Sequence, residues 1–190
     1  VVVVDRQLTG SGQSAYVESD HYKGGKLAIL HLLDCGCKNI VFLRGPLEVS
    51  SGQQRYQGYH EICNKYGIRE QCIDCLYDYE DGLRAARELV EKYHHVDGVI
   101  ASNDMIAIAT YKILTREGYR IPDDVQMIGF DNIRFSWLFT PELTTVNQPI
   151  KKMGTLAVQI ILNYAKGLPF QQENILDVSL VERQTTRRKE

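Results

Sequence analysis

The sequence predicts an α/β protein built on a parallel β-sheet with helices packed on both of its faces. Short apolar segments alternate with amphipathic ones along the chain of 190 residues. This strand–helix alternation recurs with short connections, an order typical of parallel sheets. Largely apolar segments such as residues 96–101, in which Asp97 is the one charged residue, add to the prediction, because strands that are buried on both faces have no polar side.

The hydrophobic pattern defines each element in turn. Predicted strands, rich in β-branched residues, cover residues 1–5, 39–43, 72–77, 96–101 and 125–130, with short extended segments at 144–146 and 175–181. A loop rich in Gly and Ser is expected at 8–15. Predicted helices, with apolar residues at helical spacing, cover residues 22–35, 52–66, 80–93, 104–117 and 150–165. Gly36, Gly67 and Gly118 follow three of them, in the position where glycine commonly ends a helix.

Composition places the chain among ordinary globular proteins. Apolar residues make up 44% of the sequence, and 22 Lys and Arg against 24 Asp and Glu give a net charge of −2. A chain with this balance lacks the basic footprint of a nucleic-acid-binding domain. Its purely apolar runs, such as residues 1–4, are far too short for a membrane span, so we expect no membrane partner.

The five cysteines suit a reducing compartment. Their odd number offers no disulfide framework, which predicts a cytoplasmic protein. Cys72 and Cys75 form a C-x-x-C pair, but we expect them within a strand, whereas thioredoxin-type pairs stand at the start of a helix. Neither this pair nor Cys35 and Cys37 has the surroundings of a zinc site, so we predict no metal and no cofactor.

Polar and aromatic side chains stand at the carboxyl ends of the predicted strands, where ligands bind in such sheets. Asp5, Tyr77, Asn103 and Asp131 follow four of the strands, and Arg55 lies on the helix after another. Arginine and carboxylates pair with vicinal hydroxyls, an amide donates and accepts, and a tyrosine ring covers the C–H face of a sugar. These residue types together predict a polyol site, although for Asn103 alone capping of the following helix is an equal alternative.

Known catalytic motifs are absent from the sequence. It contains neither a G-x-S-x-G nucleophile elbow nor a Walker A loop, and Gly10-Ser11-Gly12 is an isolated G-x-G. The five histidines form no recognisable metal-binding pair. We therefore expect no enzyme, and the enzymatic alternative that stays open is a hydrolase using Asp5 and Asp131 as metal ligands.

The order of motifs resembles the effector-binding region of the lactose/galactose-repressor family of bacterial transcription regulators. The matching stretches follow one another in family order: Val2-Val3-Val4-Asp5-Arg6, Arg55-Tyr56-Gln57-Gly58-Tyr59, Ser102-Asn103-Asp104, Ile128-Gly129-Phe130-Asp131-Asn132, Pro141-Glu142-Leu143-Thr144-Thr145 and Leu180-Val181-Glu182-Arg183. The chain departs from the family at Cys37, where His is common. It also departs at His21, where Asn is usual and where we expect the change to matter little.

The resemblance implies a fold of the periplasmic-binding-protein type, with two similar lobes and a ligand between them. On that basis residues 20–147 and 174–190 form one nearly complete lobe, and residues 1–19 and 148–173 form part of the other. The chain begins within a strand and without Met, so we expect it to be part of a longer protein. The family's DNA-binding helix-turn-helix would lie outside this chain.

The resemblance also implies an effector site. The family's effector contacts correspond to Asp5, Arg55, Asn103 and Asp131, with an aromatic contact at Tyr77. Gln148 matches a ligand contact in the related periplasmic ribose binders, and Ser51 lies in a loop that is expected to reach the cleft. Val49 stands where purine-responsive relatives have Arg, which argues against a nucleobase. Arg, Asn, Asp and Gln suit a neutral sugar, and we favour a pentose such as ribose.

The function that the resemblance implies is that of a sugar-responsive repressor, in which the effector closes the lobes and changes the affinity for operator DNA. The family usually forms dimers, and an apolar set is the candidate homodimer interface: Ile108, Phe135, Trp137, Leu138 and Phe139. A short buried turn at 135–139 is the equal alternative for most of this set. The main functional alternative is a periplasmic-type sugar-binding protein of an uptake or chemotaxis system, which shares the fold and a similar cleft.

Overall fold

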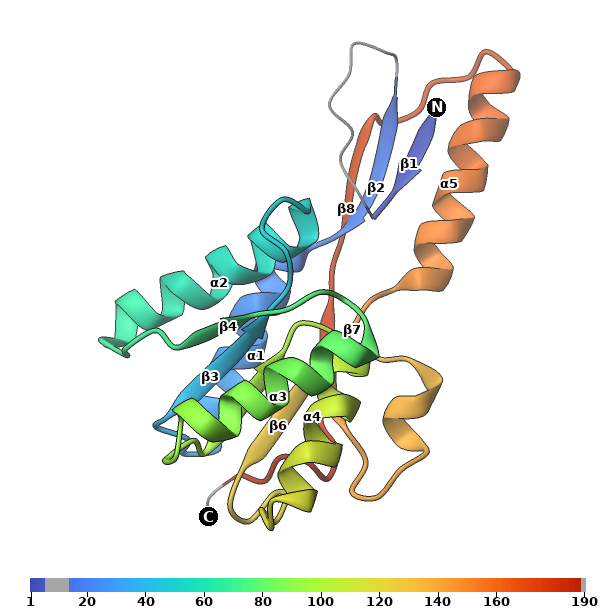
Figure 1. Ribbon diagram of the computed structural model, residues 1–190. Helices are drawn as coiled ribbons and strands as arrows, with labels where there is room; N and C mark the ends of the chain where they lie inside the picture. The colour runs from blue at the N-terminus through green and yellow to red at the C-terminus, as the bar shows by residue number, and fades with distance from the viewer. Residues whose placement is uncertain (6–13, 189–190) are drawn as a thin grey trace.

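The computed structural model describes residues 1–5 and 14–188, so Arg6 and Gly10-Ser11-Gly12 lie outside the described residues. The described chain forms two β-sheets flanked by helices, with one sheet at each end of the molecule (Figure 1). The N-terminus lies at the smaller sheet, and the C-terminus lies at the far end of the larger one. The predicted α/β class with a parallel sheet is confirmed.

The larger sheet has six strands in the order β4-β3-β5-β6-β7-β9. Their bounds are Ile40–Arg44 for β3, Cys72–Asp74 for β4, Gly98–Ala101 for β5, Gln126–Asp131 for β6, Thr144–Asn147 for β7 and Ser179–Val181 for β9. Neighbouring strands pair in parallel except at the β7–β9 edge, where the pairing is antiparallel. Because the carboxyl ends of parallel strands share one edge, the segments that follow β3, β4, β5 and β6 lie near one another.

Helices cover both faces of this sheet. Those on one face are α1 (His21–Asp34) and α2 (Ser50–Tyr66), and those on the other are α3 (Tyr79–Lys92) and α4 (Asp104–Arg116). Strand residues alternate between the two cores. Phe42 packs with Tyr59 beneath α1 and α2, whereas Leu43 packs with Leu89 beneath α3 and α4. Burial on both sides explains why the strands are continuously apolar in the sequence.

Side-chain caps begin two helices directly after a strand. Asp20 accepts a hydrogen bond from the backbone N–H of Lys23 at 2.8 Å at the start of α1. Asn103 accepts one from the backbone N–H of Ile106 at 2.8 Å at the start of α4. Gly67 ends α2 with a φ of 65°, a left-handed conformation that glycine adopts without strain. The two caps therefore mark where the chain turns at the carboxyl edge of each sheet, and Gly67 marks the turn at the opposite edge, before β4.

The smaller sheet is parallel and consists of β1 (Val2–Val4), β2 (Ala15–Ser19) and β8 (Glu173–Leu176). Helix α5 (Ile150–Ala165) packs on it, with Met153 and Ile160 against Val17. The helix and the sheet form one end of the molecule in Figure 1. The end of β1 and the start of α5 therefore lie near the carboxyl edge of the larger sheet.

Three connections join the two sheets within the described chain: Asp20 after β2, residues 148–149 after β7 and residues 177–178 after β8. The boundary expected at 173 is therefore wrong by several residues, because β8 pairs with β2 as far as Leu176. The sequence predicts one extended segment at 175–181, whereas the chain leaves one sheet and enters the other within it. Residues 177–178 contain neither glycine nor proline to mark the change.

Two strands and one turn also differ from the sequence prediction. The sequence does not predict β2, because Glu18 and Ser19 interrupt the apolar pattern although both are buried. The predicted strand at 72–77 ends at Asp74, beyond which Leu76 is exposed. The segment 135–139 begins within a 3₁₀ helix, η1 (Arg134–Trp137), so it is a turn, although most of its large side chains are exposed.

Within the described ranges, no helix is both long and apolar enough to cross a membrane. The same residues contain no group of three His, Cys, Asp or Glu side chains placed to hold a metal ion. Burial raises the pKa of the Cys72 and Cys75 thiols to about 12, so both stay protonated at neutral pH. Protonated thiols are poor nucleophiles, which disfavours redox chemistry for this C-x-x-C pair.

Candidate functional site

A cleft lies where the carboxyl edge of the larger sheet meets β1 and the start of α5. Its volume is about 450 Å³. It is lined by Asp5, Val49, Ser51, Arg55, Tyr77, Asn103, Asp131, Asn132, Ile133, Gln148 and Ile150. The structure thus brings together all seven residues that the sequence and the family resemblance single out for effector binding. Ser51 and Arg55 both lie on α2, and the others come from separate segments of the chain, as expected for a site built at strand ends.

Arg55, on α2, is the buried cation of this cleft, and it is 4% exposed. Its guanidinium donates through Nη1 to the backbone carbonyl of Ser102 and lies 3.7 Å from the centre of the Phe130 ring. Its Nε and Nη2 lie 3.3 Å and 3.2 Å from Nδ1 of His21. The Asp131 carboxylate is 3.7 Å from Nη2, beyond hydrogen-bond length. The hydrogen bonds of the guanidinium therefore go to His21 and the Ser102 carbonyl, and Asp131 pairs with it only at long range.

Asp131, at the end of β6, is the second charged group of the cleft wall. Its backbone has a φ of 109° and that of Asn132 a φ of 58°, so two successive non-glycine residues adopt left-handed conformations. The carboxylate accepts a hydrogen bond from Nε2 of Gln148 at 2.6 Å, and Oε1 of Gln148 accepts one from Ser19 at 2.8 Å. Burial raises the pKa of Asp131, while Arg55 and Gln148 oppose that rise.

Tyr77, Ser51 and Asn103 form another part of the wall. The hydroxyls of Ser51 and Tyr77 are 3.4 Å apart. Nδ2 of Asn103 donates to the backbone carbonyl of Tyr77 at 3.0 Å, while its Oδ1 caps α4. Capping and cleft lining, which the sequence leaves as alternatives for Asn103, therefore occur together. The Tyr77 ring passes so close to Gly45 that a Cβ there would lie 2.5 Å from it, which requires glycine.

Two buried residues behind the lining are not among those selected from the sequence. His21 is 1% exposed and lies between Asp5 and Arg55, and the only signal in the sequence is its departure from the family's usual Asn. Asp104 accepts hydrogen bonds from Thr145 at 2.6 Å and from the backbone N–H of Ile133 at 2.9 Å. Burial raises the pKa of Asp104 to about 7. Its place after the capping Asn103 gives no sequence signal of this environment.

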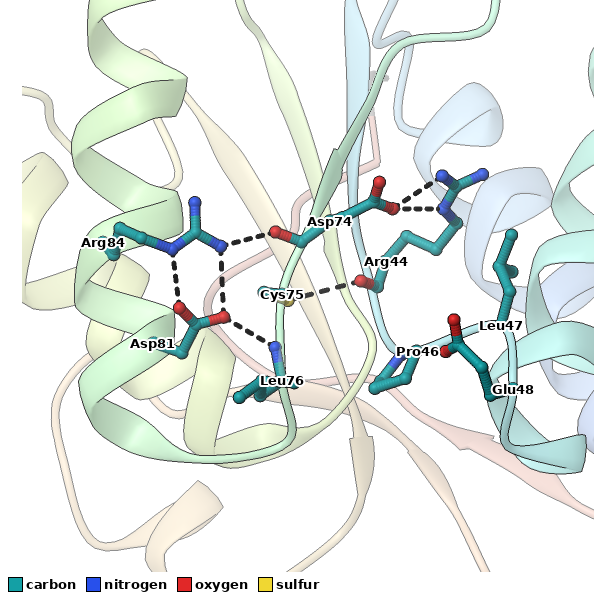
Figure 2. Close-up of a pocket in the computed structure, with 9 residues that line it drawn as sticks. All are labelled: Arg44, Pro46, Leu47, Glu48, Asp74, Cys75, Leu76, Asp81 and Arg84. Carbon is teal, nitrogen blue, oxygen red and sulfur yellow. Dashed lines mark hydrogen bonds and ion pairs between the residues drawn. The ribbon is translucent and has the colours of Figure 1, made fainter.

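A second hollow, of about 430 Å³, lies beside the edge strand β4 (Figure 2). In Figure 2, dashed lines join each of its two arginines to a carboxylate. Arg44 Nη2 is 2.6 Å from the Asp74 carboxylate, and Arg84 Nε is 2.6 Å from that of Asp81. Arg84 also donates to the backbone carbonyl of Asp74 at 2.6 Å. These charged groups hydrogen-bond to one another, whereas Arg55 and Asp131 of the cleft are 3.7 Å apart, so the cleft is the candidate site.

The predicted dimer-interface residues lie on α4 and around η1. Phe135, Trp137 and Leu138 are 60%, 47% and 58% exposed, whereas Ile108 and Phe139 are partly buried. The Phe139 ring stacks at a tilt on Tyr111 of α4, with centroids 5.1 Å apart. The exposed side chains disfavour the alternative of a fully buried turn, and their role in an interface stays a prediction.

Comparison with known proteins gives a consistent family. The chain matches the model of the periplasmic binding protein-like domain over residues 29–186. It is 36% identical over 192 residues to the ribose operon repressor of Bacillus subtilis (strain 168), a match covering 100% of this chain and 58% of that protein. The chain thus spans little more than half the length of this relative.

Solved structures of regulators share the fold. The structure is similar to that of a LacI family transcriptional regulator from Enterococcus faecium with bound ribose, with a TM-score of 0.90 and 27% identity over 100% of this chain and 71% of that one. It is also similar to the complex of the transcriptional regulator CelR with cellobiose, with a TM-score of 0.90 and 28% identity over 97% of this chain and 58% of that one. One neighbour binds a pentose and the other a disaccharide, so these likenesses do not choose the sugar.

Proposed function

The chain belongs to the periplasmic binding protein-like domain family in the form shared by LacI-type regulators, and we propose that it is most of the effector-binding part of a sugar-responsive bacterial transcriptional repressor. The observation that carries the proposal is the cleft, in which Arg55 and Asp131 face one space at 3.7 Å, a distance beyond hydrogen-bond length. The ligand that we propose is a neutral sugar, with ribose first. The cytoplasm is the compartment that a repressor requires.

The polar groups of the cleft suit a sugar ring. Arg55 can donate to two adjacent hydroxyl oxygens, and Asp131 can accept from two hydroxyls. Asn103 and Gln148 offer amide groups at the same cavity, and the Tyr77 ring offers an apolar surface for the C–H face. Asp5 reaches the cavity from β1, so a bound sugar would contact groups attached to both sheets. Hydrogen bonds to charged groups contribute about 1.5–3 kcal/mol each.

Bridging contacts of this kind provide a mechanism for regulation. A sugar that binds Arg55 beside the larger sheet and Asp5 after β1 of the smaller sheet favours the closed arrangement of the two sheets over the open one. In the proposed repressor, the change in closure alters the affinity for operator DNA, which a domain outside this chain contacts. The lobes that we propose are residues 20–147 with the C-terminal strand β9, and residues 1–19 with α5 and β8.

We further propose that the repressor is a homodimer through the exposed side chains around η1. Phe135, Trp137 and Leu138 form an apolar surface next to α4, and aromatic residues are enriched in the cores of interfaces. Analytical ultracentrifugation of the full-length protein tests this point. We expect a dimer that Trp137→Glu weakens, and a strict monomer at micromolar concentration contradicts the proposed interface.

Isothermal titration calorimetry of the full-length protein tests the sugar proposal. We expect saturable binding of ribose, weaker binding of hexoses and cellobiose, and no binding of purine bases, since no arginine stands at position 49. Operator fragments titrated with and without ribose measure the change in DNA affinity. If ribose, other pentoses, hexoses and cellobiose all give no heat and no shift in the melting temperature, the proposed ligand class is wrong. The relatives reported above are regulators, which favours a repressor over the periplasmic-type sugar-binding protein and over an enzyme.

A further inference from the structure

His21 occupies a position between the two charged groups that approach the cleft from different sheets. It is the first residue of α1, is 1% exposed and does not line the cavity. Its Nε2 lies 2.8 Å from the Asp5 carboxylate, which follows β1 of the smaller sheet. Its Nδ1 lies 3.3 Å and 3.2 Å from Nε and Nη2 of Arg55. One imidazole thus connects the acid of one half of the cleft with the cation of the other.

The hydrogen-bonding partners define the protonation state that fits this position. A guanidinium only donates, so Nδ1 of His21 must accept and carries no proton there. An ionised carboxylate only accepts, so Nε2 must carry the proton that it donates to Asp5. The neutral imidazole with a proton on Nε2 therefore satisfies both neighbours. A second proton on Nδ1 would face the guanidinium N–H groups and remove the acceptor that holds Arg55.

Contacts on its other sides fix where Arg55 lies, and the acceptor to which it could shift is the Asp131 carboxylate, 3.7 Å from Nη2. Its guanidinium lies against the Phe130 ring at 3.7 Å and donates to the Ser102 carbonyl on another side. The charged groups around His21 are Asp5 after β1, Arg55 on α2 and Asp131 at the end of β6. The Phe130 ring centroid is 5.8 Å from that of the imidazole. Loss of the Nδ1 acceptor would therefore displace the arginine that we assign to the sugar.

We propose that His21 is a positioning residue whose neutral form holds Arg55 and Asp5 in the geometry that binds the sugar, so that protonation of His21 weakens binding. This inference rests on the proposed function. It gives the His at this position a defined role, whereas the family resemblance alone predicts little consequence of replacing Asn. The sugar response of this protein is then sensitive to acid, while a protein with Asn at this position lacks a group that titrates there.

Ribose calorimetry between pH 8 and pH 5.5 tests the proposal on the full-length protein. We expect the wild-type affinity to fall roughly five- to tenfold across this range, because a proton on Nδ1 would remove the acceptor that holds Arg55. His21→Asn and His21→Gln keep an oxygen that accepts from Arg55 and an NH₂ that donates to Asp5, and they do not titrate. We expect both to bind ribose a few-fold more weakly at pH 8 and to show a flat profile. His21→Leu, which has neither group, should lose about tenfold or more at every pH.

Asp104→Asn is the matched control, because Asp104 is a buried group near the cleft whose pKa is raised to about 7. We expect this variant to retain the loss of affinity in acid. A wild-type profile that is flat, or His21→Asn and His21→Gln profiles that both retain the wild-type slope, would overturn the role of His21. Absence of sugar binding by the wild type at every pH would instead overturn the proposed function.

Nitrogen NMR of the wild-type protein labelled at the histidines tests the geometry without any sugar or variant. We expect His21 to show a protonated Nε2 and an unprotonated Nδ1 at pH 8. The opposite tautomer at that pH contradicts the acceptor role of Nδ1 and sinks the inference, whether or not ribose binds. This measurement also covers the case in which the variants fail to fold.

Discussion

In the outer hollow beside β4, Arg84 meets the Asp81 carboxylate at 2.6 Å, whereas in the cleft Arg55 approaches Asp131 only to 3.7 Å. The two spaces differ little in volume, at about 430 and 450 Å³. They differ in burial, because the side chain of Arg84 is 49% exposed and that of Arg55 is 5% exposed. Volume therefore says less about a ligand site than whether its charged groups already bind one another.

The carboxylates of the two regions show the same contrast in their pKa values. In the outer hollow, the hydrogen bond from Arg84 lowers the pKa of Asp81. Around the cleft, burial raises the pKa of Asp131 and raises that of Asp104 from 3.8 to about 7. The outer hollow therefore stabilises its charges within the fold. The cleft holds charges at a cost to the fold, which is common where a protein binds a ligand.

The largest effect that this contrast predicts is a pH-dependent stability gap between the wild type and Asp104→Asn. The folded-state pKa of Asp104 is raised, so the stability it contributes is complete below about pH 4 and is lost as pH rises through about 7. Asparagine removes this titration and can still accept from Ile133 while donating to Thr145. We expect the variant to gain about 1.4 kcal/mol on the wild type per pH unit between about pH 5 and 6, and less as the pH approaches 7. Urea unfolding at several pH values measures the gap.

Asp81→Asn provides the opposite case from the outer hollow. The folded-state pKa of Asp81 is lowered, so the stability it contributes is present above its unfolded pKa of about 4 and is lost only as pH falls through that range. Between pH 5 and 8 the gap between this variant and the wild type should therefore stay constant. If the stability gaps of Asp104→Asn and Asp81→Asn changed with pH by the same slope, the pKa values of the two carboxylates would not differ in the way that their burial indicates.

The sequence predicts the parts of the fold and cleft that depend on local pattern. Strand ends give Asp5, Tyr77, Asn103 and Asp131, because the polar residue after an apolar run is visible in the sequence and parallel strands share an edge. The pattern does not show which strand ends meet across the two sheets. That depends on three chain crossings, and the one after β8 is misplaced in the sequence prediction for lack of a turn residue.

The residues behind the cleft are harder to predict than its lining for a related reason. The role of His21 comes from Asp5, which is 16 positions away, and from Arg55, which is 34 positions away. The raised pKa of Asp104 comes from burial beneath β7 and the segment after β6. Neither environment leaves a periodic signal along the chain. The sequence therefore identifies the groups that face a ligand better than the groups that orient them.

A smaller effect, and the most direct test of the contrast, is the ribose affinity of Arg55→Ala beside that of Arg84→Ala. Removing Arg55 takes away charge-assisted hydrogen bonds to the sugar, so we expect calorimetry to show about a ten- to hundredfold loss of affinity. Arg84 is a half-exposed side chain whose partners are Asp81, Glu88 and the Asp74 carbonyl, so its removal should change ribose affinity less than about twofold.

The stability of the same two variants separates binding from folding. Exposed ion pairs contribute about 0–1 kcal/mol, so Arg84→Ala should remain close to the wild type in urea. Arg55→Ala leaves Nδ1 of His21 without its donor in a buried position, so it should lose stability as well as affinity. Equal ribose affinities for the two variants would place the sugar outside the cleft. A large affinity loss for Arg84→Ala would place it in the outer hollow, where closed ion pairs would have to open before a ligand could bind.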